Sequence, residues 1–523
     1  MATTNAMAAM ATLLLRLPLL IMRAVYATFS FYLLTPRRIK KIMERQGVRG
    51  PEPWFLVGNL SDVSSFVAES TSKDMESIRH DIVDRLLPHY VLWTKQYGKR
   101  FIYWNGVEPR LCLTEIDLIK ELLSKYSTQT GKSWLQQQGS KHFIGRGLLM
   151  TNGDDGIHQH HIIAPAFTGD KLKSYSGFMV ECTNQTLQSL QKDIDSGRTE
   201  IEIGGYMSRL TSDIISRTEF GTSYKKGKQI FDLLTVLQHR CAQTSWRLFL
   251  PGGQFFPTKC NREIKILKME VESLLMEIIE SRKDCAEHQW KCTYGDDLLS
   301  MLLNEMTART KSSYGPSAQV VMDECKTFFF AGHDTVALLL TWTVMLLATN
   351  WSWQDKVRAE VTRVCKGKNP SVDHLPKLRL LNMVINESLR LYPPASLLPR
   401  TAFEDIELGD LHVPKGLSIW IPVLAIHHSE ELWGKDVDEF NPERFASNPF
   451  SSGKFMPFAM GPRDCVGQSF AMMEAKIILA MLVSRFSFTI SDSYRHAPVT
   501  VLTIKPKHGV QIRLKPLNPC ENC

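Results

Sequence analysis

The 523-residue chain lacks several features that would place it in a specialised class of protein. Its eleven cysteines are scattered, odd in number and without a Cys/His ladder at zinc spacing, so they do not describe a disulfide framework. We therefore expect a reduced, cytosol-facing body whose thiols are mostly small core residues. Beyond residue 53 the sequence has neither an internal repeat nor a Gly/Ser-rich linker, which favours one large globule.

A strong excess of charge is also missing. Lys and Arg number 62 against 54 Asp and Glu, and the basic residues are spread out apart from one cluster near the N-terminus. Such a balance argues against a nucleic-acid polymer as partner. Residues 262–283 carry apolar side chains at three- and four-residue spacing, which predicts a helix, whereas residues 486–492 and 509–514 alternate as strands do. The prediction is a mainly α fold with small β-sheets.

The N-terminus differs from the rest of the chain. Residues 1–35 are mostly apolar and predict a membrane anchor; residues 36–53 form a basic flank and a proline-rich hinge, and 54–523 the globular body. By the positive-inside rule we expect this basic flank, and with it the body, to lie on the cytosolic side of a membrane crossed by a single helix. Arg16 and Arg23 weaken this interpretation, and a cleaved signal peptide is the alternative, although no small-residue cleavage site follows the apolar run.

The stretch GIHQHHIIAPAF, residues 156–167, places three histidines within four positions, namely His158, His160 and His161. Histidine is the commonest side-chain metal ligand near neutral pH. The stretch therefore raises the question of a metal site, which the rest of the sequence has to answer.

The strongest chemical signal is FMPFAMGPRDCVGQSF, followed by an amphipathic helical pattern. Helix N–H groups and the helix dipole stabilise a thiolate at a helix N-terminus, glycines let a flat ligand approach the backbone, and an arginine pairs with a carboxylate of that ligand. A thiolate ligand of haem iron needs these properties. A buried free cysteine is the alternative, but it does not explain the whole pattern of Phe458, Gly461, Arg463, Cys465 and Gly467.

This pattern resembles the signature of the cytochrome P-450 haem-thiolate monooxygenases. The resemblance implies the cytochrome P-450 fold, heme b with Cys465 as the axial ligand of its iron, and hydroxylation with dioxygen. It also implies electrons from NADPH, delivered by an NADPH-cytochrome reductase that carries flavin.

Two further motifs fit the resemblance. Glu387 and Arg390 lie three residues apart within an apolar stretch, which favours a buried pair over a surface one. In the family such a pair joins the arginine of a PERF motif, here Arg444, and holds the cysteine loop. In the apolar stretch 327–347, Asp334 and Thr335 resemble the acid and alcohol that relay protons to dioxygen. The alternatives are a membrane span and a plain buried helix.

The histidine stretch falls where the family carries Trp-x-x-x-Arg, whose side chains bond the haem propionates. Gly156 and His160 occupy the two positions. We therefore expect no zinc site, a partial replacement of the arginine by protonated His160, and weaker haem binding than in relatives. Arg400 and Arg463 remain as expected propionate partners.

Over most of its length the chain resembles plant members of the family that act in cytokinin biosynthesis. The resemblance rests on the stretches LTPRRIKKIMERQGVRGPEP, LLPHYVLWTKQYGKRFIYWNG, TGKSWLQQQGSKHFIGRGLLM, LSIWIPVLAIHHSEELWG and YRHAPVTVLTIKPKHGVQ. Those plant members hydroxylate the trans methyl of the prenyl side chain on isopentenyladenine nucleotides, giving trans-zeatin nucleotides. For such a prenylated adenine nucleotide, Gln137 and Gln138 are candidates to read the purine, and Phe330 and Leu397 to contact the prenyl group. Two alternatives stay open: a hydroxylase of a steroid or diterpenoid hormone, and a haem-poor, catalytically silent membrane-bound binding protein.

Overall fold

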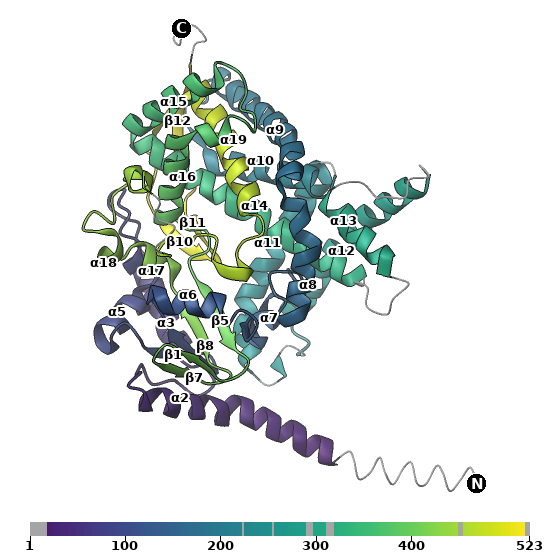
Figure 1. Cartoon of the computed structure of the whole chain (residues 1–523), viewed down its shortest axis with the longest axis vertical. Coiled ribbons are helices and arrows are strands. Elements are labelled where there is room, and N and C mark those ends of the chain that lie inside the picture. Colours follow the sequence, from purple (N-terminus) through teal and green to yellow (C-terminus); the bar gives the residue numbers. More distant parts are fainter. Residues whose placement is uncertain are drawn as a thin grey trace.

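The computed structural model describes residues 18–221, 224–250, 252–253, 256–288, 297–309, 318–447 and 453–517. Helices make up most of the body (Figure 1). The α-helices are α2 (Thr35–Arg45), α3 (Leu60–Ser70), α4 (Val83–Leu86), α5 (Pro88–Tyr97), α6 (Ile116–Ser124), α7 (Trp134–Ser140), α8 (Gly153–Ile163), α9 (Gly169–Asp195), α10 (Ile203–Thr218), α11 (Tyr224–Thr244), α12 (Lys259–His288), α13 (Leu298–Arg309), α14 (Ala318–Thr349), α15 (Trp351–Cys365), α16 (Arg379–Leu391), α17 (Val423–His427), α18 (Glu430–Trp433) and α19 (Gln468–Arg485).

Four small sheets complete the fold. The largest has the order β1-β2-β8-β5-β3 and is antiparallel except between β2 and β8, and it lies at the same end of the molecule as α2 (Figure 1). Its strands are β1 (Ile102–Asn105), β2 (Glu108–Cys112), β3 (Thr130–Gly131), β5 (Leu398–Ala402) and β8 (Ser418–Ile421). The other sheets comprise β4 (Ile201–Glu202), β12 (Gln511–Pro516) and β9 (Phe486–Ile490); β6 (Ile406–Leu408) and β7 (Leu411–Val413); and β10 (Pro498–Val501) and β11 (Thr503–Pro506).

Helix α14 lies in the centre of the body and most of its side chains are buried, so the apolar stretch within it is a core helix rather than a second membrane span. It packs closely on α10: a Cβ at Gly332 would lie 2.5 Å from the Ile215 side chain. The helix predicted over 262–283 lies within α12, and the two predicted strands overlap β9 and β12 but differ from them by two residues at their ends. The prediction of a mainly helical fold with small sheets is confirmed.

The N-terminal apolar segment is helical from Pro18 to Arg45, and the apolar part of this helix is exposed to solvent. Residues 1–17, which include half of the predicted anchor and Arg16, lie outside the described part of the chain. The helix joins the body through Ile39 and Met43, whose side chains are buried against the five-stranded sheet. The basic flank is thus the docked end of the same helix.

Candidate active site

Cys465 lies just before α19, which begins at Gln468. Of the seven cysteines described, only Cys465 is exposed. Burial raises the pKa of the thiol, while the Gly467 N–H lowers that pKa by donating a hydrogen bond to the sulfur. A bound metal ion removes the proton of a coordinating thiol outright, so metal binding decides the ionisation of Cys465.

Glycines shape the loop around the thiol. Gly461 has φ +77°, and a Cβ there would lie 2.4 Å from the Leu123 carbonyl oxygen, so only glycine fits. A Cβ at Gly467 would project to 4.0 Å from Cys465 Sγ. The loop is closed by the Cys465 N–H, which donates to the Phe458 carbonyl at 2.9 Å. The motif therefore forms a closed loop, here called the cysteine cradle, in which Gly461 permits a tight approach to Leu123 and Gly467 lies beside the sulfur.

Three cations lie close enough to one another to interact electrostatically. Lys132 follows β3, Arg400 lies in β5, and Arg463 precedes Cys465. Burial and the nearby charges of Arg400 and Arg463 lower the pKa of Lys132 to about 7, and burial and Arg463 lower that of Arg400 to about 10. Among the described residues, no carboxylate is hydrogen bonded to any of the three. Buried cations are normally paired, so this cluster is built for an anion from outside the chain.

The residues fit a haem. Cys465 would bind the haem iron through its sulfur, the glycines beside it would leave room for a flat group, and the three cations would suit the two propionate carboxylates. The structure places Lys132 beside Arg400 and Arg463, whereas the sequence suggested only Arg400, Arg463 and His160 for the propionates. In the sequence, Lys132 is marked only by its position between a buried strand and α7. Its role could not be predicted from that position, because only the fold brings it beside Arg400.

Glu387, Arg390 and Arg444 meet in one buried network. The Arg390 guanidinium forms two 2.8 Å hydrogen bonds to the Glu387 carboxylate, and both side chains are fully buried. Arg444 Nε lies 3.5 Å from Glu387 Oε1, and the Arg444 guanidinium also binds Asp436. The Asn441 N–H donates to Glu387 at 3.0 Å. The three partners predicted from sequence thus lie together and join α16 to residues 436–444.

This network continues to the cysteine loop. Arg390 Nη1 donates to the His427 carbonyl oxygen at 2.9 Å. The ring of His427 in turn accepts the Met456 N–H at 3.1 Å and stacks on Phe455. Because Phe455 and Met456 immediately precede the motif, the network supports the position of Cys465. Burial lowers the pKa of His427 to about 3, so its ring is neutral and free to accept that bond.

The histidine stretch forms helix α8. Among the described residues, no group of three His, Cys, Asp or Glu side chains is arranged to hold a metal ion. A Cβ at Gly156 would lie 2.2 Å from Nη1 of Arg463, so the glycine makes room for that guanidinium. Arg463 donates to the Thr151 carbonyl at 2.6 Å. His160 lies near Asp464 and lowers the pKa of that carboxyl, which burial raises.

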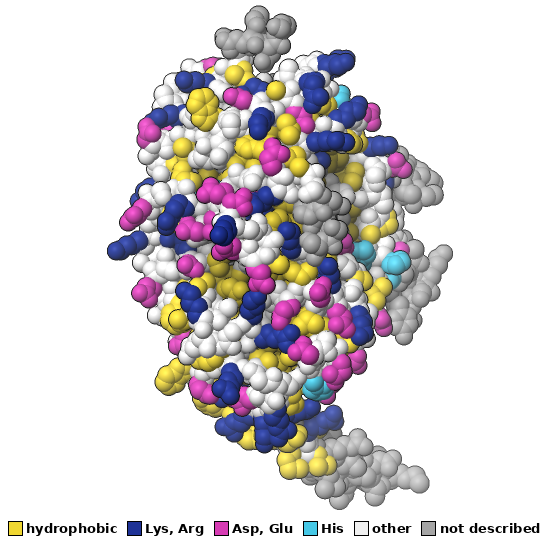
Figure 2. Space-filling view, turned by 60° about the vertical axis from the view of Figure 1, so that its left-hand side comes forward, with side chains coloured by type: hydrophobic (Ala, Val, Ile, Leu, Met, Phe, Trp, Pro, Cys, Tyr) yellow, Lys and Arg dark blue, Asp and Glu magenta, His cyan; other side chains and the backbone are white. Residues whose placement is uncertain are grey.

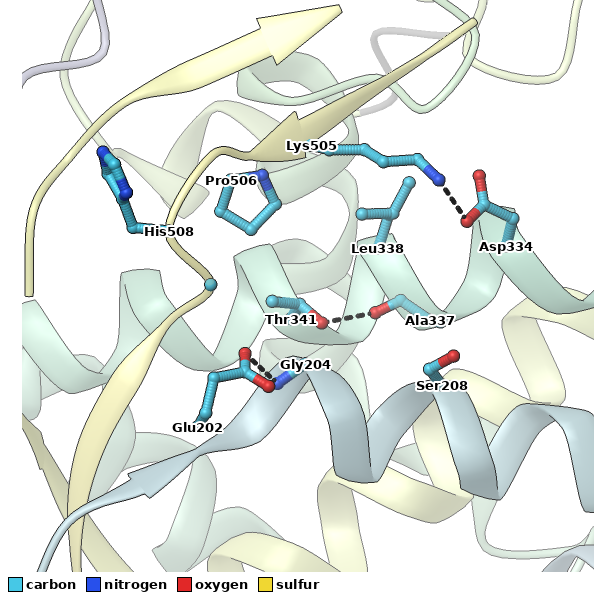
Figure 3. A pocket seen from close by; sticks show the side chains of 11 residues that line it. Glu202, Gly204, Ser208, Asp334, Ala337, Leu338, Thr341, Lys505, Pro506 and His508 are labelled. Atoms are coloured by element: carbon cyan, nitrogen blue, oxygen red, sulfur yellow. Dashed lines mark hydrogen bonds and ion pairs between the residues drawn. The ribbon is translucent and has the colours of Figure 1, made fainter. Parts of the chain in front are cut away.

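Asp334 and Thr335 lie on α14 but point in different directions. The Thr335 hydroxyl donates to the Ala331 carbonyl at 2.6 Å. The Asp334 carboxylate forms an ion pair of 2.8 Å with Lys505 of β11, beside a cavity (Figure 3). Lys505 could not be predicted as the partner of Asp334, because the ion pair joins residues 171 positions apart.

The four candidate substrate residues lie on three different elements. Gln137 and Gln138 belong to α7, and the Gln137 amide donates to the Met150 carbonyl at 2.9 Å. Phe330 of α14 packs edge-on against Phe143, and Leu397 is partly buried just before β5. Their contact with a substrate remains a prediction.

The loop that leads from α7 to α8 is fastened to α14 by two acidic residues that sequence reasoning missed. Asp323 accepts the Arg146 N–H and Glu324 the Leu148 N–H, each at 2.9 Å. Burial raises the pKa of Glu324 to about 8. A run of charged residues opening an otherwise apolar helix was the available signal for this contact.

Comparison with known proteins assigns the family. The family model described as Cytochrome P450 matches residues 49–511. Two Arabidopsis thaliana proteins named Cytokinin hydroxylase are 65% and 64% identical over 501 residues, which cover 95% of this chain and 96% and 97% of the relatives. Another A. thaliana protein, Cytochrome P450 709B1, is 38% identical over 516 residues, or 96% of this chain and 98% of the relative. The chain belongs to the cytochrome P450 family, and it is a haem-thiolate monooxygenase that receives electrons from a reductase.

Proposed function

We propose that this monooxygenase hydroxylates the trans methyl of the prenyl side chain of isopentenyladenine nucleotides and so produces trans-zeatin nucleotides. The observation that carries the proposal is the 65% and 64% identity, along nearly the whole length, to two proteins named Cytokinin hydroxylase. The intact cysteine cradle, cation cluster and Glu387 network support a working enzyme rather than a silent copy.

The chain's own residues have separate tasks in this reaction. When bound, the haem supplies the iron chemistry that activates dioxygen. Cys465 binds that iron, while Lys132, Arg400 and Arg463 hold the propionates. Gly467 adds the amide that hydrogen bonds to the sulfur.

The proposed catalytic pair is Asp334 and Thr335, which delivers protons to the reacting oxygen. Gln137 and Gln138 are proposed to bind the purine, and Phe330 and Leu397 to position the prenyl group so that its trans methyl reacts. The carbonyl oxygen of the Gln137 amide suits an exocyclic amino group, since the amide N–H₂ already donates to the Met150 carbonyl.

The test is a spectral titration of the full-length protein in membranes with isopentenyladenosine monophosphate, followed by turnover with reductase and NADPH. A low-spin to high-spin shift and a trans-hydroxylated product are expected. A shift with a brassinosteroid or a diterpenoid alone would support the hormone alternative instead. Absence of the thiolate-haem band in reduced, CO-treated membranes would support the haem-poor binding protein.

We further propose that the protein is a single-pass protein of the endoplasmic reticulum membrane with its catalytic body in the cytosol, where it meets the NADPH-cytochrome reductase. The exposed apolar helix and the Lys and Arg side chains gathered at its docked end (Figure 2) support this placement. Trp54 and Phe55, each 68% exposed, add apolar surface to that end of the body. Protease digestion of sealed microsomes tests it: cleavage of the body without detergent is expected, and full protection would contradict it.

A further inference from the structure

The N-terminal helix contacts the body at a second place, about two turns before Ile39. Its backbone widens there into a single π-helical turn, η1 (Ser30–Leu34). Turns of this kind carry an extra residue and are frequent at functional positions. The Phe31 ring lies edge-on to that of Trp134 in α7, with ring centroids 5.7 Å apart, and edge-on to the Tyr32 ring at 5.1 Å. The anchor helix therefore reaches the segment that carries the candidate purine-binding residues.

Tyr32 packs on a small apolar cluster that joins three parts of the body. The buried members of the cluster are Val107, from the turn between β1 and β2, Leu135 of α7, and Phe249 of the 3-10 turn η3 (Ser245–Phe249). Helix α7 lies at the same end of the molecule as the anchor helix (Figure 1). The anchor helix, α7 and η3 therefore share one apolar contact.

Helix α7 is short and only partly buried. It is seven residues long, and only Leu135 and Ser140 are buried. A helix of this length is marginal on its own and depends on its packing. A capping box of Ser133 and Gln136 fixes its first turn, whereas the Trp134 side chain remains 46% exposed. The contacts made through Trp134 and Leu135 are therefore important for the position of the whole helix.

The same short helix carries the two candidate glutamines. Gln137 and Gln138 follow Trp134 by three and four residues, which places them one turn further along on the same side of α7. The Gln137 amide donates to the Met150 carbonyl at 2.9 Å, a bond that lasts only while α7 keeps its place beside the loop to α8. A displacement of Trp134 would therefore move both amides.

We propose that Phe31 and Tyr32 of the anchor helix are positioning residues for substrate binding. They hold α7 against η3 and so fix where Gln137 and Gln138 present their amides. The inference rests on the proposed role of the two glutamines in binding the purine. The anchor helix acts through Trp134 and the apolar cluster and touches no substrate itself. Its seat on the body thus contributes to nucleotide affinity, which is a task beyond attachment to the membrane.

The experiment compares Phe31→Ala and Phe31→Tyr in the full-length haem protein, reconstituted in phosphatidylcholine nanodiscs. Phe29→Ala is the matched control, because Phe29 is an exposed ring on the same helix and is not part of this contact in the described structure. For Phe31→Ala we expect the Kd of isopentenyladenosine monophosphate to rise about fivefold, the size of one aromatic pair, with an unchanged rate at saturating nucleotide. Phe31→Tyr keeps the ring and should bind as the wild type does, as should Phe29→Ala.

Hydrogen exchange gives a readout that does not depend on the substrate. The amides of residues 134–140, followed by mass spectrometry without nucleotide, should exchange faster in Phe31→Ala and Tyr32→Ala than in the wild type. Their exchange should be unchanged in Phe29→Ala. In the double variant Phe31→Ala/Trp134→Ala the Kd should rise no further than in Trp134→Ala, because the two rings form a single contact.

Wild-type exchange of these amides in Phe31→Ala would overturn the inference. A wild-type Kd in Phe31→Ala, while Gln137→Ala and Gln138→Ala weaken binding, would overturn the inference alone and leave the proposed function standing. If neither glutamine substitution changes the Kd, the proposed purine contacts fail and the inference fails with them. If Phe31→Ala loses its thiolate-haem band, Tyr32→Ala decides, and wild-type behaviour there would overturn the inference.

Discussion

Glu219 offers a sharp test of the electrostatics of the core, through substitution by glutamine. It follows α10 directly and its side chain is fully buried. Within the described structure neither of its carboxylate oxygens has a hydrogen-bond partner, and Glu474 of α19 is buried in the same way. Burial raises the pKa of Glu219 to about 8, with a smaller contribution from Asp297. Glu219 is thus a neutral acid in the folded protein at pH 7.

Proton linkage fixes the direction in which the free energy of unfolding changes with pH. Between pH 4.5 and 8 the unfolded chain releases the Glu219 proton and the folded protein keeps it, so the free energy of unfolding falls as the pH rises. The slope is about 1.4 kcal/mol per pH unit, or about 3.4 kcal/mol between pH 5 and 7.5. Glu219→Gln has no proton to release and lacks this loss. Its buried amide donors cost about 1–3 kcal/mol at every pH.

We therefore expect Glu219→Gln to be less stable than the wild type at pH 5 and at least as stable at pH 7.5. Guanidinium denaturation of the full-length protein at several pH values, followed by far-UV circular dichroism, measures the difference. The exposed Glu280→Gln is the control and should show a constant difference from the wild type. A constant difference for Glu219→Gln as well would mean that Glu219 is ionised in the folded protein, and the reasoning would fail.

Three more predictions concern the haem site. Gly156→Ala should displace the Arg463 guanidinium and speed haem transfer to apomyoglobin roughly tenfold, the size of one charged hydrogen bond; an unchanged rate would contradict the contact. Lys132→Gln should also speed haem transfer roughly tenfold, and Lys132→Arg much less, because the propionates need a positive charge. Equal transfer rates for the two variants would mean that the shape of the Lys132 side chain matters and its charge does not. Arg390→Leu leaves Glu387 buried without its cation and should lower the free energy of unfolding by about 3–5 kcal/mol, with a parallel loss of bound haem; normal denaturation would refute it.

Sequence reasoning succeeded where the chemistry lies within a few consecutive residues. The five residues from Phe458 to Gly467 form one loop, so their spacing reports the cradle directly. The same holds for Glu387 and Arg390, which one helical turn brings together. Arg444 was found only because its motif resembles that of the family.

Contacts between segments far apart in the sequence could not be predicted from the sequence. Nothing near Asp334 predicts its pairing with Lys505, and nothing near Lys132 predicts Arg400, because both pairs depend on how strands return to the body. Gln137 shows a second kind of limit. The sequence suggested that its amide could bind a purine, but in the fold this amide already donates to the Met150 carbonyl. Side-chain partners at this separation follow from the tertiary fold and not from local pattern.

The N-terminal helix has a consequence for how the enzyme meets its electron donor. It runs unbroken from Pro18 into the body, where Ile39 and Met43 are buried and Gln46 exchanges two hydrogen bonds with His412. A helix held in this way is rigidly joined to the body and does not act as a flexible linker. With the helix seated in a bilayer, the body would keep one fixed attitude above the lipid plane. If a reductase were anchored in the same membrane, the two proteins would then meet by lateral diffusion. Each would already be oriented toward the other, so little rotational search would be needed.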